Sequence, residues 1–172
     1  QSTFAHALIN SIDLSEVATA NGVVTVLSAK DVPGTNDCSP VAGDDPVFAD
    51  GKVSYYGQSI FAVVAKDIAS ARDAIGLAKI EYDPLPAILT IDDAMRQESF
   101  LGPAAKIQSG DPDAEISRTK HRLSGRIEVG GQEHFYLESQ AALAIPGENG
   151  DMQIYCSTQH PSEIQHKVAE VL

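Results

Sequence analysis

The stretch KVSYYGQSIFAVVAKDIASARDAIGLAKIEYDP, residues 52–84, decides the fold class of this protein. Its β-branched and aromatic residues predict two strands, one on each side of the Gly57-Gln58 pair. Asp67 then suits the N-cap of a helix whose apolar residues recur at helical spacing. A further strand follows that helix and is broken into an extended edge by Pro84. Strands and a helix in so short a stretch indicate an α+β unit.

Upstream residues extend the same unit. Residues 6–14 and 22–28 predict two strands with a short helix between them. Residues 31–51, DVPGTNDCSPVAGDDPVFADG, form a long stretch dense in Pro, Gly, Asp and Asn. Loops of this length are usually functional or disordered. We interpret it as a surface connection, with a lid or a partner contact as alternatives.

Downstream of residue 98 the pattern changes. It predicts a linker that ends in a turn at GDPD, then a strand, a hairpin and a helix that begins at Pro161. The residues concerned are 101–116 for the linker, 120–131 for the strand, 141–158 for the hairpin and 161–172 for the helix. A single strand and a hairpin are a small partner for an amphipathic helix. We therefore expect this second unit to be the incomplete start of a larger α+β domain.

Charge and cysteine content narrow the class of protein. The chain of 172 residues has 24 acidic and 12 basic residues, for a net charge of -12. This balance disfavours nucleic acid and anionic membranes as partners, since both require a basic surface. No apolar run reaches the ~20 residues of a membrane span, and the N-terminus does not resemble a signal peptide. Cys38 and Cys156 form no CxxC motif, and a reducing cytoplasm fits them.

Generic catalytic motifs are absent from the sequence: there is no GxGxxG, GxxxxGK[ST], HExxH or GxSxG. A mixed metal site of His134, His160 and Cys156 is conceivable, but ordinary surface or half-buried side chains are the favoured interpretation. Glu133 and Glu138 would fall on opposite faces of a strand. They do not form an obvious acid–base pair.

The segment GGQEHFYLES, residues 130–139, stands apart. Two consecutive glycines, Gly130 and Gly131, weaken a strand and often mark a bulge or a close backbone approach. Gln132 follows them with an amide that has two donors and an acceptor. Such an amide could hold an oxygen-rich ligand without adding charge. On chemistry alone, a solvent-facing glutamine is the commoner alternative.

This segment resembles the signature of the molybdenum hydroxylases, the xanthine dehydrogenase and aldehyde oxidase family. GDPDAEISRTKHRLSGRIEV before it and STQHPSEIQHKVAEVL after it are similar to the start of that family's molybdopterin-binding region. Upstream, GVVTVLSAKDVPG, VSYYGQSIFAVVAKDIASARDA and KIEYDPLPAILTIDDAM resemble its α/β-hammerhead domain. In the residues of these segments, the chain is most similar to bacterial xanthine dehydrogenase large subunits.

The resemblance implies a domain order. An α/β-hammerhead domain would occupy residues 1–100, and a linker would occupy 101–116. The N-terminal fragment of a molybdenum cofactor-binding α+β domain would occupy 117–172.

The resemblance also implies a chemistry. The complete enzyme would hydroxylate purines such as hypoxanthine and xanthine at a molybdenum–molybdopterin centre, with oxygen from water. Electrons would pass through 2Fe–2S clusters and FAD, on other parts of the enzyme, to NAD. Gln132 would contact the oxo ligand of the metal, and Gly131 with Gly130 would let the backbone approach the cofactor. Glu133 and His134 are expected to have structural roles.

No catalytic residue of the family falls within residues 1–172, so this fragment alone is expected to be inactive. Its expected partners are a purine substrate, the remainder of the large subunit, and iron–sulfur and FAD subunits or domains in a cytoplasmic hetero-oligomer. Two alternatives stay open. One is an aldehyde oxidase or carbon-monoxide-dehydrogenase-like relative, and the other is a non-catalytic module that packs against an iron–sulfur subunit.

Overall fold

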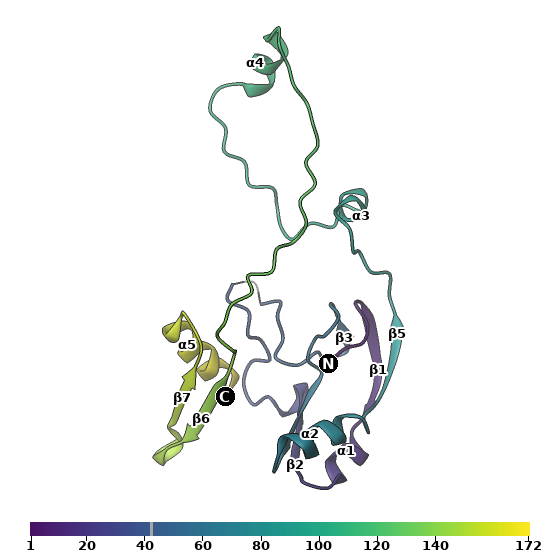
Figure 1. Cartoon of the computed structure of the whole chain (residues 1–172), viewed down its shortest axis with the longest axis vertical. Helices are drawn as coiled ribbons and strands as arrows, with labels where there is room; N and C mark the ends of the chain where they lie inside the picture. Colours follow the sequence, from purple (N-terminus) through teal and green to yellow (C-terminus); the bar gives the residue numbers. More distant parts are fainter. Residues whose placement is uncertain (42) are drawn as a thin grey trace. The chain divides into compact units, whose positions relative to one another are not determined.

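The computed structural model describes residues 1–41 and 43–172, which form two compact units. The first unit comprises residues 1–88 and 158–172, and the second comprises residues 89–157. Helices and strands are mixed in both (Figure 1), as the α+β prediction requires. Among the described residues, no helix has the length and apolar character needed to cross a membrane.

A three-stranded antiparallel sheet with the order β3-β1-β5 organises the first unit. Strand β1 spans Ala7–Asp13, β3 spans Lys52–Val53 and β5 spans Lys79–Pro84. Strand β1 is central, and its register with β5 shifts between Ile9 and Ser11, as in a β-bulge. Only two residues of the strand predicted over 52–57 pair with β1, because the chain turns at Gly57, where φ is 87°.

A second, two-stranded sheet pairs β2 (Val23–Ser28) with β4 (Phe61–Ala65), and a short 3-10 turn, Ala29–Asp31, follows β2. Helices α1 (Ser15–Thr19) and α2 (Ile68–Ile75) pack against these strands. Asp67 caps α2 as predicted, because its Oδ1 accepts a hydrogen bond of 2.8 Å from the Ser70 backbone N–H.

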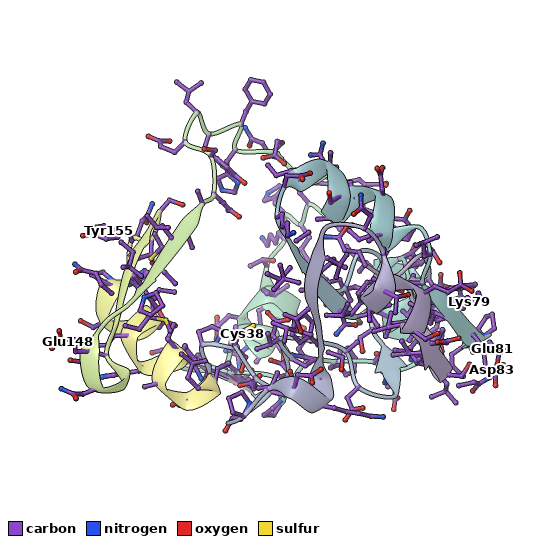
Figure 2. The ribbon with its side chains drawn as sticks, turned by 90° about the horizontal axis from the view of Figure 1, so that it is seen from below. Cys38, Lys79, Glu81, Asp83, Glu148 and Tyr155 are labelled. Atoms are coloured by element: carbon purple, nitrogen blue, oxygen red, sulfur yellow. The ribbon has the colours of Figure 1, made fainter. Side chains whose placement is uncertain are left out.

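The core of the first unit is a cluster of buried apolar residues from β1, β3 and two neighbouring parts of the chain. These residues are Ala7 on β1, Val53 on β3, and Ala49 and Ile60. The rings of Phe4 and Tyr82 pack against this core with centroids 4.9 Å apart. The other face of β5 is polar: Lys79, Glu81 and Asp83 alternate with half-buried residues and are exposed (Figure 2).

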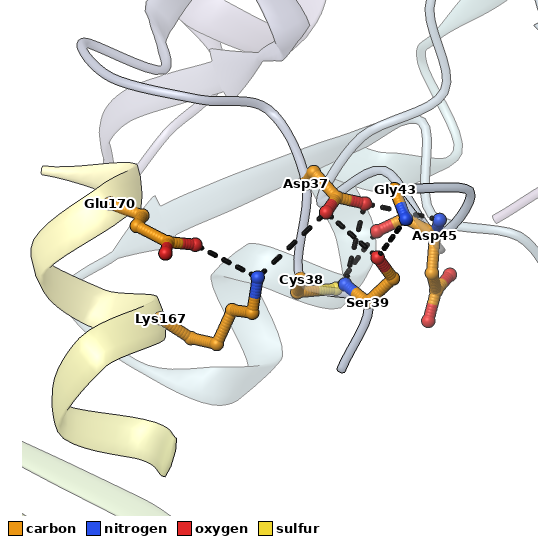
Figure 3. A network of polar contacts seen from close by, with 7 residues as sticks. All are labelled: Asp37, Cys38, Ser39, Gly43, Asp45, Lys167 and Glu170. Atoms are coloured by element: carbon orange, nitrogen blue, oxygen red, sulfur yellow. Dashed lines mark hydrogen bonds and ion pairs between the residues drawn. The ribbon is translucent and has the colours of Figure 1, made fainter. Parts of the chain in front are cut away.

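Hydrogen bonds link the described residues of the loop over 31–51 to one another, and Figure 3 shows those around Asp37. The Asn36 amide donates to the Phe48 carbonyl at 2.8 Å and accepts from the Phe48 N–H at 3.0 Å. Asp37 accepts hydrogen bonds from the Ser39 hydroxyl at 2.8 Å and from the Asp45 N–H at 3.2 Å. This part of the chain is thus folded on itself.

The same loop docks on the last turn of helix α5 (Pro161–Val171) within the first unit. The backbone N–H groups of Gly34 and Thr35 donate to the carbonyls of Val171 and Glu170 at 2.9 and 2.7 Å. These bonds satisfy carbonyls that a helix end leaves without partners. The loop is therefore an intramolecular contact with α5, and not merely the surface connection that we expected.

The second unit contains two helices and a hairpin. Helix α3 spans Ile91–Arg96, α4 spans Pro112–Arg118, and strands β6 (Ala142–Pro146) and β7 (Met152–Cys156) form the predicted antiparallel hairpin across the turn Glu148–Gly150. Helix α4 replaces the turn predicted at GDPD. Its cap is formed by Asp111, whose Oδ1 accepts from the Ala114 N–H at 3.0 Å.

The strand predicted over residues 120–131 is not formed in the structure. The segment is extended, but it pairs with no strand among the described residues, and its apolar side chains are exposed. Leu123, Ile127 and Val129 are 104%, 89% and 82% exposed. The strand prediction was wrong here, because the alternating pattern describes only the segment itself and a strand also needs a hydrogen-bonded neighbour.

Candidate cofactor-binding site

The motif at residues 130–139 lies in the extended segment between α4 and β6 of the second unit. All of its residues are exposed, including Gln132 and Gly131, the two predicted to bind the cofactor. The Gln132 amide is therefore open to a group that is not part of this chain. Its two N–H donors and one acceptor suit a ligand that presents oxygen atoms.

Gly130 and Gly131 do not form the bend that the sequence suggested. Neither has a positive φ, and a Cβ added to either would meet nothing within 4 Å. The only residue of the motif in the left-handed region is Phe135, at φ 52°. The glycines thus leave the backbone beside Gln132 open to a close approach, and the left-handed residue Phe135 lies three residues after Gln132, before the bend at Leu137 and Glu138.

Short hydrogen-bonded links organise the rest of the motif. The Glu133 side chain reaches forward, and its Oε1 accepts from the Phe135 N–H at 3.3 Å. Gln140 donates from Nε2 to the Tyr136 hydroxyl at 3.4 Å. The Glu133 side chain is therefore linked to the backbone two residues further along the chain.

The sequence left open a mixed metal site of His134, His160 and Cys156. Across residues 1–41 and 43–172, no group of three or more His, Cys, Asp or Glu side chains is placed to hold a metal ion. A molybdenum–molybdopterin group nevertheless fits the donor set, because an exposed neutral amide and open glycine backbone can bind its oxygen-rich periphery. This segment would contribute hydrogen bonds to such a group and not direct metal ligands.

A further polar network joins residues of the loop over 31–51 to helix α5 (Figure 3). The hydrogen bond from the Ser39 hydroxyl lowers the pKa of Asp37, and nearby Lys167 lowers it further. Lys167 forms ion pairs with Glu170 at 2.8 Å and with Asp37 at 3.9 Å, and its hydrogen bond to Glu170 raises the pKa of the ammonium group. Burial and the charge of Asp45 raise the pKa of the Cys38 thiol, so this cysteine is not an activated nucleophile.

This network was missed by sequence reasoning. The signal that could have found part of it is the spacing of Asp37 and Ser39, since Asp side chains often accept from the residue two positions on. Its contacts stabilise the loop and the end of α5. We assign it a structural role.

Comparison with known proteins identifies both parts of the chain. Residues 1–86 match the aldehyde oxidase and xanthine dehydrogenase a/b hammerhead domain, and residues 94–172 match the molybdopterin cofactor-binding domain. The chain is 42% identical to xanthine dehydrogenase from Dictyostelium discoideum over 98% of its length. It is also 42% identical to aldehyde oxidase 2 from Cavia porcellus, over 99% of its length.

A solved structure shows the same fold. Quinoline 2-oxidoreductase from Pseudomonas putida 86 matches 99% of this chain with a TM-score of 0.82 and 25% identity. The matched region is 24% of that chain. Among the curated relatives the matched share is smaller: the chain spans 12% of the Dictyostelium protein and 13% of the Cavia protein, about one eighth of each.

Proposed function

Because the chain belongs to the aldehyde oxidase and xanthine dehydrogenase family of molybdenum-dependent oxidoreductases, we propose that it is part of the large subunit of a xanthine dehydrogenase. In this proposal residues 1–100 form the hammerhead domain and residues 101–116 form a linker. Residues 117–172 open the molybdenum cofactor-binding domain. The observation that carries the proposal is the exposed Gln132 amide beside two unobstructed glycines, inside the region that matches a molybdopterin-binding domain.

Gln132 and Gly131 are the residues of this chain that would hold the cofactor. The Gln132 amide would donate a hydrogen bond to an oxygen of the cofactor and so help to orient the group without adding charge. Gly131, together with Gly130, lets the backbone come close, since neither carries a side chain that would meet the ligand.

The bound molybdenum cofactor would supply the redox chemistry with which a purine such as hypoxanthine or xanthine is hydroxylated by oxygen from water. The fragment alone would not turn over substrate. Its partners would be the remainder of the large subunit and iron–sulfur and FAD subunits or domains, through which electrons reach NAD. Both cysteines of this chain are free, in keeping with a reducing cytoplasm.

An aldehyde is the second candidate substrate. The observation in its favour is the equal identity, 42%, to a xanthine dehydrogenase and to an aldehyde oxidase. Steady-state kinetics of the complete enzyme with xanthine and with an aromatic aldehyde separates the two. A kcat/KM at least tenfold higher for xanthine supports the proposal, and the reverse ratio assigns the enzyme to aldehydes.

The experiment that tests the site is Gln132→Ala in the complete enzyme. Removal of the amide takes away a hydrogen bond to a polar group, so we expect kcat to fall by about tenfold or more while the subunit stays folded. The measurements are molybdenum content per subunit, kcat and circular dichroism.

The matched control is Gln140→Ala, which removes the same side chain eight residues further along the same exposed segment. Its kcat should stay within about twofold of the wild type. If Gln132→Ala changes neither kcat nor molybdenum content, the segment is a packing module and the cofactor proposal is wrong.

A further inference from the structure

Three residues other than glycine have a positive φ among the described residues: Glu98, Phe135 and Asn149. Two are explained by local structure. Asn149 lies in the turn of the β6–β7 hairpin, and asparagine tolerates this conformation. Glu98 follows helix α3, where the Ser99 N–H donates to the Ala94 carbonyl at 2.9 Å, as expected for a left-handed helix end.

Phe135 has neither explanation. It belongs to no helix end or hairpin, and a bulky aromatic residue is among those that rarely adopt this region. Its side chain is 85% exposed, so packing within this chain does not offset the strain. The contact that supports this conformation is the hydrogen bond from its own N–H to Glu133 Oε1.

Backbone strain of this kind is typical of sites that bind a ligand or act in a reaction. Here it lies three residues after Gln132. On the other side of Gln132, Gly130 and Gly131 carry no side chain, and a Cβ added to either would meet nothing within 4 Å. The left-handed backbone at Phe135, linked by its N–H to the Glu133 side chain, is thus the conformationally restricted element of the motif beside the Gln132 amide.

We propose that Phe135 is a positioning residue, whose left-handed backbone, supported by Glu133, aims the Gln132 amide at the cofactor. This inference rests on the proposed function of Gln132. The important property of Phe135 is its backbone conformation, and its ring is secondary.

Two isomeric replacements separate backbone from side chain. Leucine and isoleucine have the same composition, but isoleucine is branched at Cβ and tolerates a positive φ less well. Asparagine, in contrast, adopts this region readily. Phe135→Leu and Phe135→Asn should therefore keep the left-handed backbone at this position, and Phe135→Ile should lose it.

The variants are compared in the complete enzyme, with Gln132→Ala beside them. The measurements are molybdenum content, kcat, KM and the Mo(V) electron paramagnetic resonance signal. We expect Phe135→Ile to lower kcat by about tenfold and to shift the resonance in the direction seen for Gln132→Ala. Phe135→Leu and Phe135→Asn should stay within about threefold of the wild type, with its resonance.

Equal losses in all three variants would assign the effect to the ring and overturn the inference. So would a Phe135→Ile enzyme with wild-type kcat and resonance. If Phe135→Ile does not fold, Phe135→Asn decides: a wild-type resonance supports the inference, and an altered one overturns it. A Gln132→Ala enzyme identical to the wild type would show instead that the proposed function is wrong.

Discussion

At Gly34 the structure leaves no room for a side chain. A Cβ added there would lie 2.3 Å from the Glu170 carbonyl oxygen and 2.9 Å from the Val171 carbonyl carbon. Both atoms belong to backbone, so neither can move aside cheaply. The glycine is required by this close approach, because its φ lies outside the positive range.

We predict that Gly34→Ala loosens the contact between the loop and α5. Overpacking against backbone costs about 1–3 kcal/mol, and the hydrogen bonds from Gly34 and Thr35 would lengthen. Hydrogen exchange of the α5 amides in the complete subunit should become faster by the factor that this free-energy cost represents. Gly102→Ala is the control, since an added Cβ there meets nothing within 4 Å. Unchanged exchange in Gly34→Ala would contradict the account of this contact.

Residue-scale features of the candidate site were only partly predictable. The identity of Gln132 and its flanking glycines could be read from the sequence, because the motif is short and local. The left-handed backbone at Phe135 could not, since propensity alone disfavours a positive φ for an aromatic residue.

Elements with strong local signals were predicted well. The cap at Asp67 and the first-turn Pro161 both stand where helices begin, because capping depends on residues a few positions apart. Asp111 and Pro112 begin α4 in the same way, as N-cap and first helical residue. This helix start was not predicted, because the composition of GDPD is also typical of a turn. At residues 120–131 a strand was predicted that the structure does not form, since strand pairing depends on distant residues.

The loop over residues 31–51 was beyond local reasoning. Asn36 and Phe48 are 12 residues apart, and Asp37 and Lys167 are 130 residues apart. No propensity describes such contacts, so the composition indicated a loop and nothing of its order. In the structure, its polar side chains form hydrogen bonds within the loop and an ion pair with Lys167 of α5.

The Asp37 network predicts an acid-sensitive contact. Its folded-state pKa is lowered by the Ser39 hydroxyl, so the unfolded chain binds the proton more readily. The stabilisation is fully present above the unfolded pKa of about 3.9 and is lost as pH falls through the lower folded value. Hydrogen exchange of α5, corrected for its intrinsic pH dependence, should therefore accelerate below about pH 4 in the wild type.

The variant that tests this is Asp37→Asn, which keeps the size of the side chain and removes its titration. Its α5 amides should be less protected at pH 7 and should show a flatter pH dependence. A wild-type and a variant profile that fall in parallel would assign the acid sensitivity to the other carboxylates with lowered pKa values, Asp13, Asp31 and Asp67.

At the scale of the whole molecule, the chain contains two regions that match different domains of the same family. The hammerhead match covers residues 1–86 and the molybdopterin-binding match covers 94–172. Helix α5, from the second match, packs in the same compact unit as the first. The motif around Gln132 and the extended segment before it are, in contrast, exposed throughout. This arrangement suits a motif that is completed by a cofactor and by other parts of a larger enzyme.

The most direct test of the central claim is a crystal structure of the complete enzyme with its molybdenum cofactor bound. The quantity to measure is the distance from Gln132 Nε2 to the nearest oxygen at the metal. Our account predicts a hydrogen bond of about 2.7–3.2 Å. A Gln132 side chain that points into bulk solvent, with no cofactor atom within hydrogen-bonding distance, would contradict it.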